Sequence, residues 1–254
     1  MPLFSFELDT FQITDTRSAH KDSDYVSFTL KIGGADPLNV AKSMGNLNNG
    51  TFNIGLSYSG QNIAPDTTVV LNYLIINSGG PSAASTIEST LTTLGTRLAN
   101  VPSFNLPPLT SSLQLVATKF KQELSPIINS SSCDGLVAAE QNTFTYDQLL
   151  SNTSQFPFFT ATTSHTGAKS PNGCNSRPSA YVVHWSMKQL VVVPQVDRML
   201  LGDAKQALSK VPLGAVVKPG NPTSLDSEVT GANPIVGSLV PTGSIVTLAT
   251  IIAP

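Results

Sequence analysis

Acidic side chains gather in one short stretch near the N-terminus. The segment from Asp15 to Asp24 holds three aspartates, two cations and one of the three histidines of the chain. Carboxylates two positions apart, as in Asp22 and Asp24, can face one point in a loop, and oxygen ligands of this kind suit calcium. Asp15, Asp22 and Asp24 are therefore the predicted metal ligands, and calcium is the predicted cofactor.

Two other interpretations of this segment stay open. His20 together with Asp22 or Asp24 could supply the acid/base groups of an enzyme, or bind a catalytic metal. The simpler interpretation is that the aspartates cap turns and pair with Arg17 or Lys21. An EF-hand is excluded, because the stretch lacks the glycine and the distal glutamate of that loop.

A second set of candidates lies further along the chain and would bind a ligand: His165, His184 and Trp185. His165 ends a polar stretch, and His184 precedes Trp185 in a strand-like segment, so the two side chains point to opposite faces. An exposed Trp185 would offer a stacking platform for sugars, while a buried one would belong to the core. For His184 the alternative is a partly buried, hydrogen-bonded histidine.

The composition excludes several partners. Only 12% of the residues are charged and the net charge is -2, so no field of one sign attracts nucleic acid or an anionic membrane. No apolar run approaches the roughly 20 residues of a membrane span. The Walker loop, the dinucleotide-binding GxGxxG pattern and the zincin motif are all absent. Ser, Thr and Asn replace charge, which favours sugar-facing or self-associating surfaces.

The compartment depends on processing. The N-terminal residues alternate like a strand and lack the basic region of a signal peptide. We expect a cytoplasmic protein if the chain is a full precursor, and a secreted or cell-surface protein if a signal peptide was removed. Cys133 and Cys174 are either two free thiols or one disulfide, which would favour an oxidising compartment.

Hydrophobic periodicity predicts a mainly β fold, either an antiparallel β-sandwich or a partly closed barrel. Alternating apolar residues mark strands over 3–80 and again over 130–194, with a loop expected from Ser164 to Pro178. Helical spacing predicts an inserted helical hairpin over about 85–124, opened by a capping box at Ser85 and Glu88. One further helix is expected near 195–210. An irregular tail over 219–242 and a paired strand over 243–253 should complete the chain.

We expect the chain to form one compact domain over 1–254, and two interpretations of its internal organisation are possible. Val26–Lys31 and Val183–Lys188 share the pattern Val-x-aromatic-hydroxyl-aliphatic-Lys. This repeated pattern suggests two related β units, 1–80 and 130–194, on either side of the helical hairpin. Chance similarity between two alternating strands is the other explanation.

These features predict a non-enzymatic β-sandwich protein that binds a partner or builds a structure. Its calcium-supported loop would contact glycans, another protein surface or like subunits. The alternative is an enzyme whose pocket lies between the helical hairpin and the sheet, with His20, Asp22 and Asp24 as its working groups.

Overall fold

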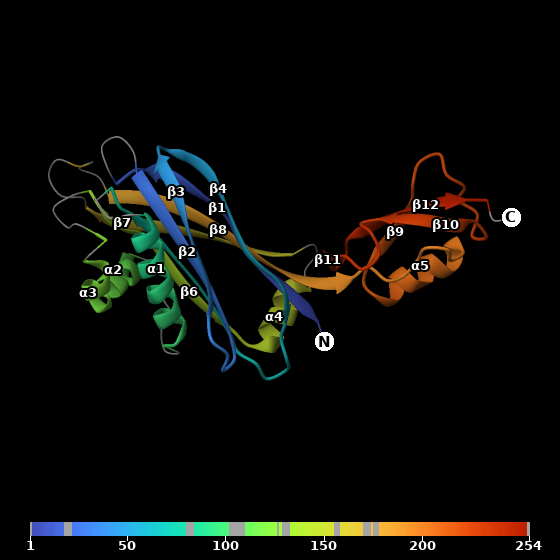
Figure 1. Ribbon diagram of the computed structural model, residues 1–254, viewed down its shortest axis with the longest axis horizontal. Coiled ribbons are helices and arrows are strands. Elements are labelled where there is room, and N and C mark those ends of the chain that lie inside the picture. The colour runs from blue at the N-terminus through green and yellow to red at the C-terminus, as the bar shows by residue number, and fades with distance from the viewer. Residues whose placement is uncertain are drawn as a thin grey trace.

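The structure is a computed structural model that describes residues 2–17, 22–79, 84–101, 110–125, 127–128, 133–154, 158–169, 174 and 178–252. It confirms the predicted fold class, because antiparallel strands form two facing sheets with helices on one side (Figure 1). A third, smaller sheet lies near the C-terminus.

Two sheets build the sandwich. Sheet A has the order β11-β8-β1-β4, with β7 also paired to β8, and sheet B has the order β3-β2-β5-β6. The strands of sheet A are β1 (Leu3–Asp15), β4 (Gly50–Asn62), β7 (Phe159–Lys169), β8 (Pro178–Val192) and β11 (Leu239–Pro241). Those of sheet B are β2 (Asp22–Ile32), β3 (Leu38–Leu47), β5 (Val69–Asn77) and β6 (Gly135–Phe144).

The main core lies between the two sheets. Alternate residues of each strand point inward, so Phe4, Phe6 and Leu8 of β1 pack with Val26 and Phe28 of β2. These side chains are fully buried, which removes a large apolar area from water and stabilises the sandwich.

Sheet B is covered on its outer face by helices, as the sequence predicted for the hairpin. The helices are α1 (Ala84–Ala99), α2 (Thr110–Lys119) and α3 (Lys121–Leu124). Ile87, Leu91 and Leu94 of α1 pack against Leu74 and Ile76 of β5. Every residue of β5 is buried, since one face meets sheet A and the other meets the helices. This explains its continuous apolar sequence.

The predicted capping box at Ser85 and Glu88 is wrong. Ser85 lies inside α1, which begins at Ala84. The Glu88 carboxylate instead accepts a hydrogen bond from the backbone N–H of Ser43 on β3, at 2.9 Å. A tertiary contact therefore replaces the local one, and it fixes α1 against sheet B.

The loop expected from Ser164 to Pro178 is partly strand. β7 continues to Lys169 because its residues pair with the start of β8, His165 lying opposite Tyr181. α4 (Tyr146–Thr153) connects β6 to β7 and begins with a capping box between Thr145 and Gln148. Both sheets combine strands from 1–80 and 130–194, and a duplication of these halves stays a prediction.

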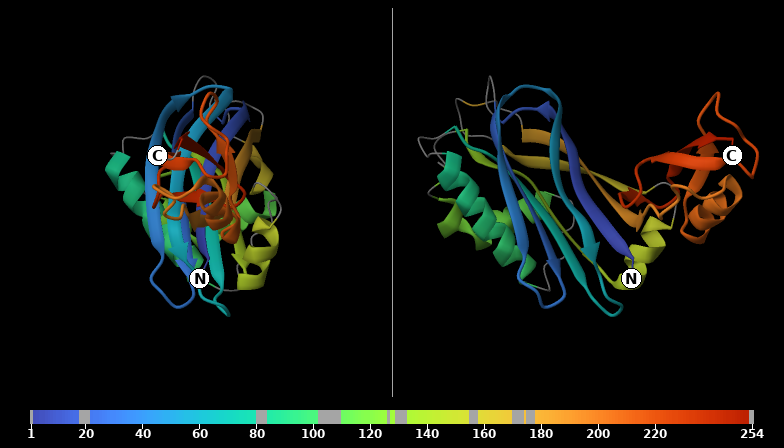
Figure 2. Two further views of the ribbon diagram at one scale, coloured as in Figure 1. Left: turned by 90° about the vertical axis from the view of Figure 1, so that its right-hand side faces the viewer. Right: turned by 45° about the vertical axis from the view of Figure 1, so that its right-hand side comes forward.

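Residues 193–252 form a C-terminal lobe with a hydrophobic cluster of its own. Its elements are α5 (Leu201–Lys210), β9 (Gly214–Val217), β10 (Glu228–Asn233) and β12 (Ile245–Ile251). The lobe projects beyond the end of β8, on the side opposite α1–α3 (Figures 1 and 2). β11 joins the lobe to the sandwich, because it pairs with the last residues of β8.

Two expectations for this lobe need correction. α5 starts at Leu201 rather than near 195, because Arg198 adopts a left-handed φ of 65° and donates its N–H to Val229. The expected irregular tail contains β10 and β11, whose apolar pattern is too sparse to read from the sequence. The closing strand is confirmed, since β12 pairs with both β9 and β10.

Gly95 marks the closest approach of α1 to sheet B and gives a first prediction. A methyl group at this position would overlap Thr29 Oγ1 and Asn39 Nδ2, and the Gly95 carbonyl accepts a hydrogen bond from Asn72. We expect Gly95→Ala to lower the free energy of unfolding by about 1–3 kcal/mol, despite the better helix propensity of alanine. Urea unfolding measures this change. Gly34→Ala is the matched control, because its added methyl group meets no atom within 4 Å. Equal stabilities of the two variants would contradict the prediction.

Candidate functional site

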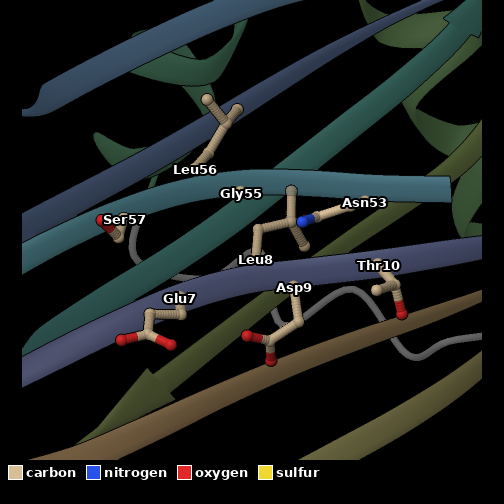
Figure 3. Close-up of a pocket in the computed structure, with 8 residues that line it drawn as sticks. All are labelled: Glu7, Leu8, Asp9, Thr10, Asn53, Gly55, Leu56 and Ser57. Atoms are coloured by element: carbon tan, nitrogen blue, oxygen red, sulfur yellow. The ribbon is translucent and has the colours of Figure 1, made fainter.

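The outer face of sheet A carries a shallow hollow between β1 and β4. Its volume is about 470 Å³, and polar side chains alternate with apolar ones in its lining: Glu7, Leu8, Asp9, Thr10, Asn53, Gly55, Leu56 and Ser57 (Figure 3). In Figure 3 the carboxylates of Glu7 and Asp9 lie on the same side of β1, and Leu8 points to the opposite side. The hollow therefore places polar side chains around a partly apolar surface, above the apolar core.

Irregular strand pairing creates this hollow. The register of β1 shifts between Leu8 and Thr10 against both neighbouring strands, so Asp9 is an extra residue relative to β8. Gly55 of β4, at the same level, has a φ of 64°, which glycine adopts without strain. Bulges bend a strand and redirect its side chains, and they are frequent beside functional sites. Here they turn both Asp9 and Thr10 outward.

Charges around the hollow are partly compensated. Glu7 Oε2 forms an ion pair with Lys188 Nζ at 2.6 Å, and that ammonium lies 5.3 Å from the centre of the exposed Phe158 ring. Burial raises the pKa of Asp9, and Glu7 adds to this, while a Ser186 hydrogen bond, Lys188 and His184 lower it. The face thus presents acceptors, donors and one aromatic ring within a small area.

One predicted ligand-binding residue reaches this face and another does not. His184 lies opposite Thr10, with its Nδ1 2.8 Å from Thr162 Oγ1. Trp185 points the other way, is 2% exposed and packs between Phe144 and Phe159. A buried indole cannot stack on a sugar, so Trp185 belongs to the hydrophobic core between the two sheets.

Asp22 and Asp24 are in a strand and not in a loop. Both are fully buried and point between the sheets, where the Tyr181 hydroxyl lies 2.7 Å from Asp22 Oδ2 and 3.1 Å from each Asp24 carboxylate oxygen. The backbone N–H of Arg17 also donates to Asp22, at 2.7 Å. They therefore face away from the helical hairpin, whose interface with sheet B is filled by apolar side chains. Asp15 ends β1 opposite Ala180, and His20 lies outside the described residues.

The predicted metal site has no further support from the geometry. Within the ranges that the structure describes, no three His, Cys, Asp or Glu side chains form a group that could hold a metal ion. The calcium ligation by Asp15, Asp22 and Asp24 stays a prediction. Melting curves with excess calcium and with excess EDTA test it, because a bound ion raises the melting temperature.

The two cysteines form a disulfide beside this buried acidic group. Cys133 precedes β6 and Cys174 lies between β7 and β8, 41 residues further along the chain. Next to Cys133, the Asp134 carbonyl accepts a hydrogen bond from Arg17 Nε, and its carboxylate accepts one from Gly79. A side chain on Gly135 would collide with the Arg17 guanidinium, so glycine lets Arg17 lie in this position. The disulfide thus closes one end of the sandwich.

His165 lies inside the sandwich, whereas the hollow is on the outer face of sheet A. Its Nε2 is 2.7 Å from the Tyr73 hydroxyl, which donates to Glu140 Oε2 at 2.6 Å. The three side chains come from β7, β5 and β6, and each is at most 6% exposed. No ligand reaches a group buried in this way, so His165 does not belong to a binding surface in the described structure.

Sequence reasoning missed the residues that line the hollow. Glu7 and Asp9 alternate with Phe6 and Leu8 on the first strand, which is the ordinary pattern of a solvent-facing side. The useful signal was Gly55 in the middle of a strand-like run, because an isolated glycine there indicates a bulge.

No family model matches the chain, and no curated protein matches it significantly. Among the residues with described structure, no helix is both long enough and apolar enough to cross a membrane.

Asp24 gives a prediction about pH. Burial raises its pKa well above the usual 3.8, the charge of Asp22 acts in the same direction, and the Tyr181 hydrogen bond opposes them. The unfolded chain therefore loses this proton first as the pH rises above about 4, and the native state loses stability up to the folded pKa. Below about pH 4 we expect the difference in free energy of unfolding between Asp24→Asn and wild type to stay constant. As the pH rises through this window, the free energy of unfolding of Asp24→Asn should increase relative to that of wild type.

Denaturant unfolding at a series of pH values measures this effect. Asp36→Asn, an exposed carboxylate in the turn between β2 and β3, is the control and should follow the wild-type curve. An Asp24→Asn curve parallel to that of wild type at every pH would refute the prediction.

The disulfide gives a further prediction. Closing a loop of 41 residues restricts the unfolded chain by on the order of 4 kcal/mol. The double variant Cys133→Ser and Cys174→Ser should lose a comparable free energy of unfolding. A thiol assay on the denatured, unreduced wild-type protein should find no free thiol, and finding two would contradict the bond.

Proposed function

We propose that the chain is a non-enzymatic binding protein that holds a glycan on the outer face of sheet A. The observation that carries the proposal is the hollow formed by the bulges at Asp9 and Gly55, which offers hydrogen-bonding groups above a five-stranded sheet. The wide use of Ser, Thr and Asn in place of charge agrees with an uncharged, polar partner.

The side chains that line the hollow can form hydrogen bonds with the hydroxyl groups of a sugar. Carboxylates such as Asp9 accept from two neighbouring hydroxyls at once, and the exposed amide of Asn53 both donates and accepts. Glu7 is neutralised by Lys188, so the face does not demand a strongly charged ligand. Phe158, 39% exposed beside Lys188, supplies an apolar ring of the kind that packs on a sugar face.

The enzymatic alternative has weaker support. It requires His20, Asp22 and Asp24 to face a pocket between the hairpin and the sheet, whereas both aspartates bond to Tyr181 on the other side of sheet B. The disulfide favours an oxidising compartment, which fits a protein that meets glycans outside the cell.

Titrations with oligosaccharides test the proposal. Backbone amide NMR spectra would be recorded with cellohexaose and with the hexasaccharide of N-acetylglucosamine, each in millimolar excess. We expect chemical-shift changes in β1, β4 and β8 that saturate with one of these glycans. Asn53→Ala and Asp9→Asn should each weaken binding by about tenfold, the effect of losing roughly 1.4 kcal/mol of hydrogen bonding.

Asn48→Ala is the control, because Asn48 is exposed in the turn between β3 and β4 and lies outside the hollow. Repeating the titration with calcium and with EDTA tests whether an ion supports the contact. The proposal fails if neither glycan perturbs the outer face. Concentration-dependent shifts of that face without sugar would instead assign it to contact between like subunits.

A further inference from the structure

A buried chain of hydrogen bonds links three strands across the sandwich. His165 on β7 meets the hydroxyl of Tyr73 on β5, and Tyr73 donates to Glu140 on β6. The other Glu140 oxygen accepts from the Asn142 amide, at 2.8 Å. This group connects the edge of sheet A to sheet B, since β7 belongs to the first and β5 and β6 belong to the second.

The direction of these bonds, together with the surroundings of Nδ1, indicates the protonation state of His165. The single proton of the Tyr73 hydroxyl is donated to Glu140, so the oxygen accepts from His165 Nε2–H. The other ring nitrogen, Nδ1, is buried and has no hydrogen-bond partner among the described residues. A proton on Nδ1 would place a hydrogen-bond donor and a positive charge at a buried position where no described residue offers an acceptor. The closed sandwich therefore holds a neutral imidazole.

The ionisable groups around His165 differ in their effects. Burial lowers the pKa of His165 from 6.5 to about 4, although the Glu140 charge raises it. Burial also raises the pKa of Tyr73, so this neighbour stays protonated. Tyr181 of β8 pairs with His165 and contacts Asp22 and Asp24 beyond it.

The remaining neighbour of β7 is the helix α2, which brings one ionisable side chain, the exposed Lys119. Raising the pH destabilises the whole fold through Asp24, whose pKa is raised, so this group opposes global unfolding in acid. Among these side chains, His165 is therefore the one whose protonation disfavours the closed state as the pH falls.

The position of β7 allows it to separate without unfolding the protein. Of the described strands, β7 is hydrogen-bonded to β8 alone, and it meets β6 through side-chain packing. The disulfide ties the start of β6 to the connection between β7 and β8, and α4 joins β6 to β7 at the other end. Both ends of this edge stay tethered, so an opened β7 can return to its place.

We propose that His165, Tyr73 and Glu140 form an acid-sensitive latch: protonation of His165 releases β7 from β6 while the rest of the sandwich stays folded. This inference does not depend on the proposed glycan site. It assigns to the β6–β7 edge a conformational change that the chain undergoes when it moves into mildly acidic surroundings.

The linkage sets the size and the direction of the effect. In the open state His165 is solvated and takes up a proton near its ordinary pKa of 6.5, while the closed state resists protonation down to about 4. The ratio of open to closed molecules therefore rises as the pH falls through this window, by up to about 300-fold.

Trp185 is a built-in reporter for this edge. It is the one tryptophan of the chain, and its ring centre lies 5.9 Å from that of Phe144 on β6 and 5.5 Å from that of Phe159 on β7. Opening lets water reach the indole, so its fluorescence should shift to longer wavelength as the pH is lowered from about 7 to about 4. The shift should reverse when the pH is restored.

Hydrogen exchange with mass spectrometry locates the change. After correction for the intrinsic effect of pH, peptides from β7 should exchange faster in acid, and peptides from β2 should not. His165→Gln keeps a neutral donor for Tyr73 and cannot titrate, so it should abolish both responses. His184→Gln is the matched control, because His184 also contacts β7 but from the outer face, and it should respond like wild type.

Three outcomes would overturn the latch. One is an unchanged Trp185 spectrum and unchanged β7 exchange in the wild-type protein. Another is an acid response that persists in His165→Gln. The third is equal acceleration of exchange in β2 and β7, which would mean global acid unfolding. The wild-type exchange data decide the question even if His165→Gln does not fold.

Discussion

The alternation of side chains along β8 is the constraint on which the rest of the structure depends. Its inward residues Tyr181 and Trp185 complete the core, while its outward residues His184 and Lys188 build the polar face. Because successive side chains of a strand point to opposite faces, these roles cannot be exchanged without a shift of register. The same strand pairs with β1, β7 and β11, so it joins the sandwich, its edge strand β7 and the C-terminal lobe.

The interior of the sandwich is polar at the end where β2 begins. Asp22 and Asp24 share the hydroxyl of Tyr181, and the neighbouring His165 shares that of Tyr73 with Glu140. Buried polar groups destabilise a fold unless they are hydrogen-bonded, so each tyrosine hydroxyl has to lie where it does. The disulfide and Arg17 hold the surrounding backbone, which keeps this geometry in place. Apolar packing defines the fold, and these bonds define which strands meet at this end.

Local patterns predicted the architecture because they depend on neighbours in the sequence. The apolar spacing of Ile87, Leu91 and Leu94 correctly indicated the first helix, and the continuous apolar run of β5 correctly indicated a central strand. The acidic segment misled for a physical reason. Asp24 is acceptable in a buried strand only because Tyr181 arrives from 157 residues away, and no local pattern contains that partner. The hollow could not be predicted for the same reason. A bulge depends on how two strands pair, and a local sequence pattern does not contain that pairing.

The two buried ionisable groups act on stability in opposite directions and on different scales. As the pH falls from about 6.5 to about 4, holding His165 in its neutral form costs the folded state an increasing amount of stability. Over the same range the folded state regains the stability that it loses when Asp24 is ionised. Global stability therefore changes less across this window than either group alone would require. The local equilibrium has no such compensation, because Asp24 lies on β2 and His165 lies on the edge strand that moves. Acid can then act on one edge of the sandwich without a matching loss of stability in the whole.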